Sequence, residues 1–271
     1  MTSQACVFGN PIAQSRSPII HHHFAKQFDI PLKYTKIAPS LSGFAPAVEQ
    51  FFSCANAVGA NVTLPFKEEA FQLADELSSH AKRASAVNTL INLNGTIRGD
   101  NTDGRGLIAD LKYHGVDLAN KSVLLLGAGG AAKGSLPAII DAKPNSVYIY
   151  NRTPSKAKSL VDSTENYASC QVACFSGGDS EKAFDLIINA TSLSLHDEVP
   201  SVPKSVFCEN SIAYDMVYLD KPTSFMEFAR HSGSQVQIDG LGMLIEQAAL
   251  SFQQWFNEHP KTEGLRHQLR K

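Results

Sequence analysis

The sequence lacks a strong charge of either sign. Its 271 residues carry 24 Lys and Arg against 26 Asp and Glu, which gives a formal net charge of -2 at pH 7. Such a balance provides no broad basic field for nucleic acid or for an anionic membrane. We therefore expect no nucleic-acid or membrane partner, and a small-molecule substrate fits the composition better.

Cysteine is scarce, and long apolar runs are missing. The five cysteines, at positions 6, 54, 170, 174 and 208, form no Cys-x-x-Cys pair and leave one thiol over in any disulfide scheme. The N-terminal residues have neither the charged region nor the apolar core of a signal peptide, and no apolar run has membrane-spanning length. We expect reduced thiols and a cytoplasmic protein.

What is present is the composition of a globular protein, with 43% hydrophobic and 18% charged residues. The length favours two lobes. β-rich runs alternate with helical patterns, which indicates an α/β fold on mostly parallel sheets. In the first part the predicted strands are 5–8, 32–37, 60–63, 89–93 and 96–99, and the predicted helices are 18–28, 43–54 and 67–77. Asn94-Gly95 predicts a hairpin turn, because both residues tolerate positive φ.

The second part repeats this alternation. A helix entered through Thr102 and Asp103 and closed by Gly115 is expected to link the lobes. The strands predicted after it are 122–126, 146–150, 171–175, 186–189, 212–215 and 235–238. Apolar residues at helical spacing predict a last helix over 241–256, and the basic end LRHQLRK is interpreted as a frayed terminus.

The strongest local motif is SVLLLGAGGAAKG, from Ser122 to Gly134. An apolar strand leads into a glycine turn, and Ala132 takes the third small-residue place, where the next helix must approach the sheet. Free backbone N–H groups at such a helix start can hold a pyrophosphate. A purely structural turn is the alternative, but the strand before and the helix after the turn favour a dinucleotide site.

The next predicted strand ends in NRTPSKA, where NAD-specific proteins usually carry an acidic residue. Asn151, Arg152, Thr153 and Lys156 stand there instead, and the two cations favour the 2′-phosphate of NADP. A polar strand end with solvated cations is the alternative.

Two further residues carry little weight individually. Lys67 in NVTLPFKE would by itself be a surface lysine, and Asp103 in GDNTDGRG would be an ordinary N-cap.

The run His21-His22-His23 invites a metal hypothesis, but consecutive helical residues point about 100° apart, so no metal is expected.

Several motifs in order resemble the shikimate dehydrogenase family. They are FGNPIAQSRSP, NVTLPFKE, AVNTL, GDNTDGRG, GAGGAAKG, NRTPSKA, INATSL, YDMVY and GLGMLIEQAA, which together run from Phe8 to Ala249. The resemblance implies NADP-dependent, reversible reduction of 3-dehydroshikimate to shikimate, in the pathway of aromatic amino-acid biosynthesis. It also implies a substrate domain over 1–101 and 239–271, a Rossmann-like domain over 102–238, and an active site in the cleft between them.

The resemblance also assigns residues to roles. Lys67 and Asp103 would be the catalytic pair, and the sequence does not assign the travelling proton to one of the two members. The substrate would be held by Ser15, Ser17, Asn61, Thr63, Lys67, Asn88, Asp103, Tyr218 and Gln247. The cofactor would be held by Gly127, Ala128, Gly129, Gly130, Ala131, Asn151, Arg152, Thr153, Lys156, Thr191, Met216, Gly240 and Met243. Methionines are usually core residues, so Met216 and Met243 carry less weight.

Two residues depart from the family pattern. Ser194 stands where glycine is expected, and Asp220 stands where proline is more usual. The resemblance therefore does not predict the conformation of the loop near the nicotinamide. Two alternatives also remain: a dual quinate/shikimate dehydrogenase that uses NAD or NADP, and a non-catalytic NADP-binding sensor. The oligomeric state is left as monomer or homodimer.

Overall fold

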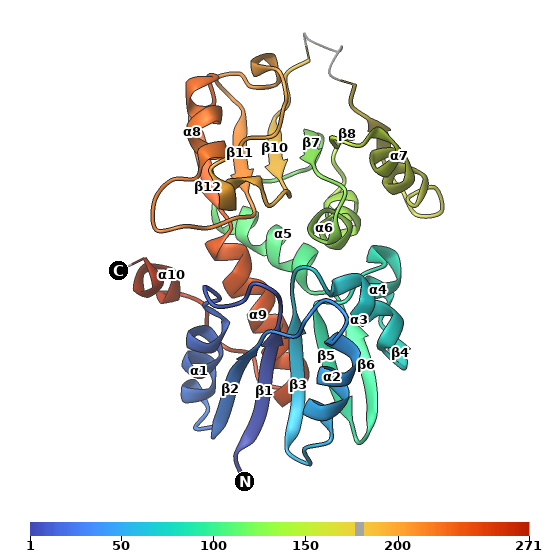
Figure 1. Ribbon diagram of the computed structural model, residues 1–271. Helices are drawn as coiled ribbons and strands as arrows, with labels where there is room; N and C mark the ends of the chain where they lie inside the picture. Colours follow the sequence, from blue (N-terminus) through green and yellow to red (C-terminus); the bar gives the residue numbers. More distant parts are fainter. Residues whose placement is uncertain (177–181, 271) are drawn as a thin grey trace. The chain divides into compact units, whose positions relative to one another are not determined.

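The computed structural model describes residues 1–176 and 182–270, and the chain forms two compact units (Figure 1). Unit 1 comprises Met1–Gly106 and Leu244–Lys271, and unit 2 comprises Leu107–Met243. The chain passes from one unit to the other inside two helices, α5 (Asp103–Tyr113) and α9 (Leu241–Phe256).

Unit 1 is built on a six-stranded sheet in the order β2-β1-β3-β5-β6-β4. Its strands are β1 (Ser3–Phe8), β2 (Leu32–Ile37), β3 (Ala57–Val62), β4 (Glu76–Leu77), β5 (Thr89–Leu93) and β6 (Thr96–Asp100). Strand β1 is parallel to β2 and β3, whereas β5 runs antiparallel between β3 and β6. The carboxyl ends of β1, β3 and β6 and the amino end of β5 therefore meet at one edge of the sheet.

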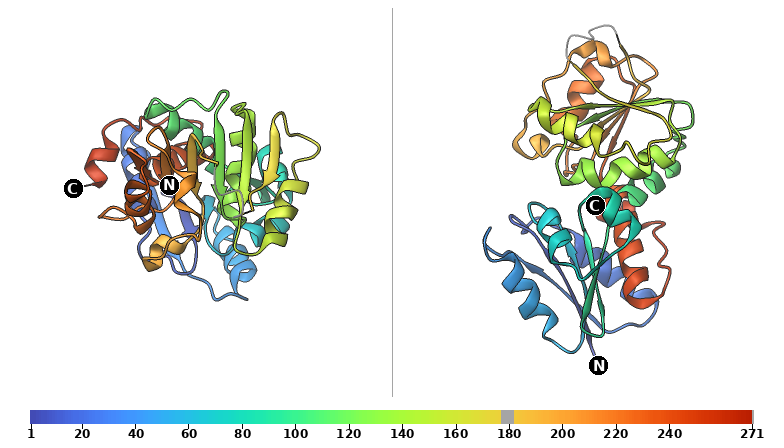
Figure 2. Two further views of the ribbon diagram at one scale, coloured as in Figure 1. Left: turned by 90° about the horizontal axis from the view of Figure 1, so that it is seen from above. Right: turned by 90° about the vertical axis from the view of Figure 1, so that its right-hand side faces the viewer.

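Helices cover both faces of this sheet (Figure 2). The helices of this unit are α1 (Ser17–Gln27), α2 (Phe44–Phe52), α3 (Lys67–Leu73), α4 (Ser79–Ala84), the C-terminal part of α9 and the short α10 (Leu265–Leu269). Alternation along β1 sends Phe8 into a cluster with Phe44 of α2, while Val7 joins Tyr34 and Trp255 on the opposite face.

Unit 2 is a doubly wound sheet in the order β12-β11-β10-β7-β8-β9, with every pairing parallel. Its strands are β7 (Ser122–Leu126), β8 (Ser146–Tyr150), β9 (Gln171–Cys174), β10 (Leu186–Asn189), β11 (Ile212–Asp215) and β12 (Val236–Asp239). Its helices are α6 (Gly130–Asp141), α7 (Pro154–Asp162), α8 (Ser224–His231) and the short η1 (Leu193–His196) and η2 (Lys204–Val206). The strand order reverses between β7 and β10, where proteins of this architecture bind nucleotides.

Many sequence predictions are confirmed. The strands at 32–37, 89–93, 122–126, 146–150, 186–189 and 212–215 and the helix at 241–256 coincide with the observed bounds. The Asn94-Gly95 turn joins β5 to β6 with positive φ at both residues, 55° and 101°. All five cysteines are free thiols.

The predicted helix 67–77 is wrong in its second half. Helix α3 ends at Leu73, because the backbone becomes extended at Ala74. The Asp75 amide then donates to the Ile97 carbonyl, and the Ile97 amide donates to the Asp75 carboxylate. Glu76 and Leu77 form β4, and Ser78 caps the short helix α4 by accepting from the Ala81 amide. A six-residue helix is too short to show a periodic pattern.

The prediction of a frayed C-terminus is also wrong. Residues 265–269 form α10, whose Leu265 is buried. The guanidinium of Arg266 lies 2.8 Å from the Glu246 carboxylate of α9, and Arg16 donates to the Leu269 carbonyl. In the part of the chain that the structure describes, no helix is both long and apolar enough to cross a membrane.

Candidate functional site

Most of the predicted substrate residues gather at one edge of the unit 1 sheet. Asn61 lies near the end of β3, Asn88 directly precedes β5, and Asp103 follows β6 at the start of α5. The serine pair comes after β1, and Thr63 and Lys67 come after β3. Because these strand ends share an edge, residues far apart in sequence become neighbours.

Lys67 and Asp103 form an ion pair at this edge. Lys67 Nζ donates to Asp103 Oδ2 at 2.7 Å, and the two side chains are only 15% and 7% exposed. Asp103 is held further by its own amide, which donates to the Asn101 side chain at 3.1 Å. The amine and the carboxylate of the predicted catalytic pair therefore lie in direct contact, and their catalytic role stays a prediction.

Asn88 connects the ion pair to helix α9. Its Nδ2 donates to Asp103 Oδ1 at 2.8 Å and lies 3.2 Å from Gln247 Oε1. Its Oδ1 accepts from the backbone amide of Thr102 at 2.9 Å, which fixes the amide orientation. Asn88 is 2% exposed, so its polar atoms need these partners.

Gly106 allows α5 and α9 to approach each other closely at this point. A Cβ on Gly106 would lie 2.7 Å from the Cβ of Gln247 and 2.8 Å from its backbone nitrogen. Real side chains do not pack that tightly, so any larger residue would push Gln247 away from Asn88. The glycine in the GDNTDGRG motif therefore has a packing role.

Asn61 lies in a second, adjoining group of polar side chains. Tyr34 donates its hydroxyl to Asn61 Oδ1 at 2.8 Å, and Asn61 Nδ2 donates to Ser251 Oγ at 3.0 Å. Burial raises the pKa of Tyr34 well above its usual value; Cys6 adds to this shift, and the Ser17 hydroxyl opposes it. Ser17 is thus next to Tyr34, and Ser15 donates to Ser17 Oγ at 3.1 Å.

The other two predicted substrate residues are Thr63 and Tyr218. Thr63 is half-buried, and its amide donates to the Phe8 carbonyl. Tyr218 is half-buried and belongs to unit 2, unlike the rest of the predicted substrate set.

Several members of these networks were not predicted from the sequence. Thr89, Thr102 and Ser251 are all fully buried and bond to Asn88, to Asn61 or to one another. Two signals were available: Thr102 adjoins Asp103 in the same motif, and Ser251 lies one helical turn after Gln247.

In unit 2 the glycine turn follows β7 as predicted. Gly127 has φ of +111°, a value that favours glycine, and it lies against Ala190 and Thr191 beyond β10. Gly129 precedes α6, a Cβ there would meet open space, and no side chain among the described residues caps the helix. Ala128 and Ala131 flank Gly129 and Gly130, so the exposed amides fit a pyrophosphate.

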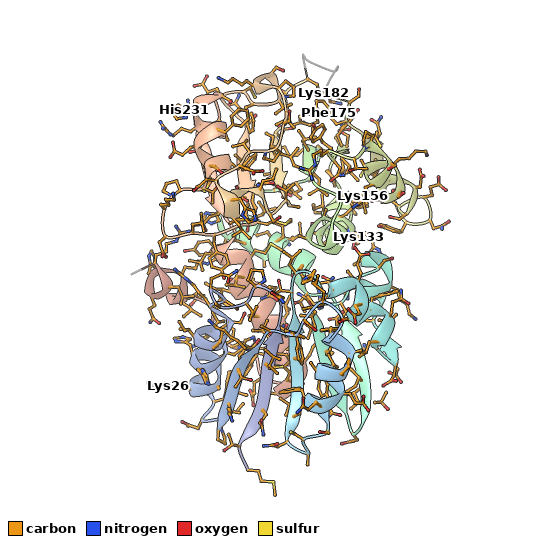
Figure 3. All side chains as sticks on the ribbon, in the orientation of Figure 1. Lys26, Lys133, Lys156, Phe175, Lys182 and His231 are labelled. Carbon is orange, nitrogen blue, oxygen red and sulfur yellow. The ribbon has the colours of Figure 1, made fainter. Side chains whose placement is uncertain are left out.

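The end of β8 carries the predicted cations. Arg152 and Lys156 are exposed, and neither forms an ion pair with any described residue; Lys156 is labelled in Figure 3. Asn151 donates to the Thr153 carbonyl at 2.9 Å, so it shapes the turn into α7. This turn has Asn151 where NAD-specific proteins carry an acidic residue, and beside it stand two cations that pair with no acidic side chain in residues 1–176 and 182–270, which fits NADP rather than NAD.

The remaining cofactor residues also lie at carboxyl ends of strands. Thr191 follows β10, Met216 follows β11, and Gly240 follows β12. A Cβ on Gly240 would lie 2.1 Å from the Met216 carbonyl oxygen, so these two strand ends touch. Met243 is 8% exposed and belongs to the unit 2 core, which is the ordinary place of a methionine.

The three consecutive histidines point in different directions. His21 is fully buried, His22 is exposed and accepts from the Tyr34 amide at 3.4 Å, and His23 is half-buried. Over residues 1–176 and 182–270, no group of three or more His, Cys, Asp or Glu is arranged to hold a metal ion.

A doubly wound unit with a glycine turn, together with a separate α/β unit bearing a shielded lysine–carboxylate pair, defines a two-domain dinucleotide-dependent oxidoreductase. Three family models match the chain: the shikimate dehydrogenase substrate binding domain over residues 7–90, shikimate/quinate 5-dehydrogenase over 109–196, and the shikimate 5′-dehydrogenase C-terminal domain over 240–270.

Individual relatives agree with these models. The chain is 47% identical to the shikimate dehydrogenase (NADP(+)) of Janthinobacterium sp. (strain Marseille), over 99% of this chain and 97% of that protein. An Ael1 enzyme from Pseudomonas putida has a TM-score of 0.91 at 37% identity and covers 100% of this chain and 99% of its own. Shikimate 5-dehydrogenase from Thermus thermophilus, in complex with NADP(H) and shikimate, has a TM-score of 0.88 at 30% identity, over 99% of both chains. The chain belongs to the shikimate dehydrogenase family.

Proposed function

We propose that the protein catalyses the NADP-dependent, reversible reduction of 3-dehydroshikimate to shikimate, within the pathway of aromatic amino-acid biosynthesis. The observation that carries this proposal is the Lys67–Asp103 ion pair, linked through Asn88 to Gln247. A lysine held by a carboxylate at a hydroxyl-binding edge is suited to moving the proton of an alcohol.

The chemistry divides between the cofactor and the side chains. The chemistry that NADP would supply, when bound, is an acceptor for the hydride from the carbon that bears the reacting hydroxyl. Lys67 and Asp103 would accept the hydroxyl proton in this direction and return it in the other, and the ammonium would stabilise the alkoxide. Atoms and charge balance, because shikimate loses one hydride and one proton.

The substrate is a small acid with several hydroxyls. Hydroxyl and amide side chains both donate and accept, so they can pair with every hydroxyl of such a ring. We assign this role to Ser15, Ser17, Asn61, Thr63, Asn88, Tyr218 and Gln247. An analogue that lacks one hydroxyl would leave a buried polar partner unpaired, which is a strong basis for rejection.

The cofactor would lie over the carboxyl ends of the unit 2 strands. We assign its pyrophosphate to the turn 127–131, its 2′-phosphate to Arg152, Thr153 and Lys156 beside Asn151, and its nicotinamide to Thr191, Met216, Gly240 and Met243. Support comes from the uncapped helix start at Gly129 and from the exposed cations at the end of β8, which form no ion pair within the described part of the chain. A cytoplasmic location and a monomer or homodimer remain predictions of the sequence.

The test is the appearance of reduced-nicotinamide absorbance with NADP or NAD, each with shikimate and with quinate. We expect NADP with shikimate to give the highest kcat/KM by a wide margin. Comparable rates with quinate or with NAD would instead identify a dual dehydrogenase. NADP binding without turnover of either acid would identify a non-catalytic sensor.

A further inference from the structure

Asp215, the last residue of β11, is a buried carboxylate outside the proposed catalytic pair. It is fully buried, and four donors surround it. Ser194 and Thr223 donate their hydroxyls to Oδ2 at 2.7 and 2.6 Å, and Asn189 Nδ2 and the Val217 amide donate to Oδ1 at 3.1 and 3.0 Å. No described Lys, Arg or His forms an ion pair with it, so neutral donors alone compensate the charge.

The electrostatics make these hydroxyls important. Burial raises the pKa of Asp215, and the donors Thr223, Ser194, Val217 and Asn189 oppose that shift. A buried carboxylate without a cation is costly unless all its acceptor sites are filled. Among the described residues, only two hydroxyls bond to Oδ2, those of Ser194 and Thr223. Ser194 is also the residue that stands where glycine was expected.

Asn189 carries the effect of Asp215 to the predicted nicotinamide loop. Because its Nδ2 points at Asp215, its Oδ1 must face the other way, where it accepts from the Thr191 hydroxyl at 2.7 Å and the Thr191 amide at 3.1 Å. Thr191 in turn lies against Gly127 of the glycine turn. A carboxylate at 215 therefore fixes the rotamer of Asn189 and, through it, the position of Thr191.

The same carboxylate acts on the other strand end. Its contact with the Val217 amide holds the backbone immediately after Met216, whose own amide donates to the Asn189 carbonyl at 3.0 Å. Thr223 also accepts from the Met226 amide at 3.2 Å as the cap of α8, so the segment between β11 and α8 bonds to one carboxylate near both of its ends, at Val217 and at Thr223.

We propose that Asp215 is a positioning residue for the nicotinamide end of the cofactor, and that Ser194 and Thr223 complete its hydrogen bonds. Asp215 acts through Asn189, Thr191 and Met216 and does not touch the cofactor itself. This proposal rests on NADP being the cofactor, but not on shikimate being the substrate.

The test compares NADP with adenosine 2′,5′-bisphosphate, which carries the 2′-phosphate and lacks the nicotinamide. In Asp215→Asn, where an NH₂ group must replace one acceptor, we expect the Kd of NADP to rise about tenfold, because a misplaced loop weakens ligand contacts. The Kd of adenosine 2′,5′-bisphosphate should stay within about twofold of wild type. In turnover, the KM of NADP should rise while the KM of shikimate does not.

Ser194→Ala gives a milder second variant, in case Asp215→Asn does not fold. Its matched control is Ser234→Ala, which removes another buried hydroxyl of unit 2 that bonds only outside the Asp215 network. We expect a rise in the Kd of NADP of about threefold for Ser194→Ala and no change for Ser234→Ala.

Two results would overturn the proposal. Equal losses of affinity for NADP and for the bisphosphate would show a general effect on unit 2, and unchanged NADP affinity in both Asp215→Asn and Ser194→Ala would show no effect on the nicotinamide end. These binding measurements remain readable if wild type fails to oxidise shikimate, a failure that would instead contradict the proposed function.

Discussion

The two proposed half-sites differ in how their side chains are held. In unit 1, Lys67, Asp103, Asn88 and Gln247 form one connected set of hydrogen bonds and are largely shielded from solvent. In unit 2, the cations at the end of β8 are exposed and unpaired among the described residues, and the turn 127–131 offers backbone amides.

The difference follows from what each half-site must recognise. A small ring with several hydroxyls requires donors and acceptors at fixed positions, so its partners are buried and bonded to each other. A phosphate is a multiply charged anion with many acceptor positions, so mobile cations and a helix start can bind it. Substitutions should therefore act differently in the two units.

The largest effect is expected from Lys67→Ala in unit 1. Loss of the group that moves the alcohol proton should lower kcat by about two orders of magnitude or more, while the Kd of NADP barely changes. Steady-state kinetics and NADP binding measure the two quantities separately. The control is Lys26→Ala, a substitution of an exposed residue of α1 (Figure 3). An unchanged kcat in Lys67→Ala would remove Lys67 from the mechanism.

His21 provides a pH test of the interior beneath the substrate half-site. Its ring stacks on Tyr34 at 4.4 Å with an interplanar angle of 7°, and neither nitrogen finds a hydrogen-bond partner among the described residues. Burial lowers the pKa of His21 to about 3; the nearby Asn61 opposes this shift, and His22 adds to it. The folded state therefore keeps this ring neutral, whereas the unfolded chain binds a proton below about pH 6.5.

The sign of the pH effect follows from this lowered pKa. The stability that His21 contributes is fully present above the unfolded pKa and is lost as the pH falls toward 3, by about 2 kcal/mol at pH 5. His21→Phe should remove this loss, so denaturant unfolding at pH 7 and pH 5 should show a smaller drop than in wild type. His231→Gln, which removes an exposed ring, should keep the full drop; an equal drop in His21→Phe would refute the assignment.

Arg152→Ala tests the exposed half-site. Loss of a charged hydrogen bond to the 2′-phosphate should raise the KM of NADP about tenfold and leave the KM of NAD nearly unchanged. Lys158→Ala on the same helix as Lys156 is the matched control, because Lys158 pairs with Asp162 at 2.9 Å. Equal losses for both nucleotides would show that Arg152 does not read the 2′-phosphate.

The smallest effect is expected at the C-terminus. Arg266→Ala breaks a partly buried ion pair with Glu246 and should lower the free energy of unfolding by about 1 kcal/mol. Arg230→Ala, which breaks an exposed pair with Glu227, should change it less. Denaturant unfolding measures both, and equal stabilities for Arg266→Ala and wild type would mean that this ion pair contributes nothing to unit 1.

The sequence predicted regular elements best where pattern and length agreed. The apolar run 122–126 and the last long helix were placed at their observed bounds, because a buried parallel strand and a long amphipathic helix have strong periodic signals. Helix α4 and helix α10 were missed because each is too short for such a signal. Their positions depend on tertiary contacts, such as the Arg266–Glu246 pair.

The sequence also predicted site residues that carry an obvious chemistry, but not those that hold them. Lys67 and Asp103 lie together, whereas Ser251 and Asp215 were not predicted as site residues, although Ser251 lies one helical turn after Gln247 and Asp215 lies within the YDMVY motif. Their roles arise from contacts between distant segments, which only the folded chain reveals. Ser194 was noticed as a departure, and its hydrogen bond to Asp215 gives the physical reason for a hydroxyl there.

Because the substrate residues of unit 1 already bond to one another, we expect this unit to bind its substrate before any nucleotide binds. Calorimetric titration of shikimate into the nucleotide-free protein tests it most directly, with Asn88→Ala beside wild type. We predict measurable binding to wild type without NADP, and an affinity at least about tenfold lower in Asn88→Ala, because the loss unpairs several buried groups at once. Binding that requires NADP, or equal affinity in both proteins, would contradict the claim.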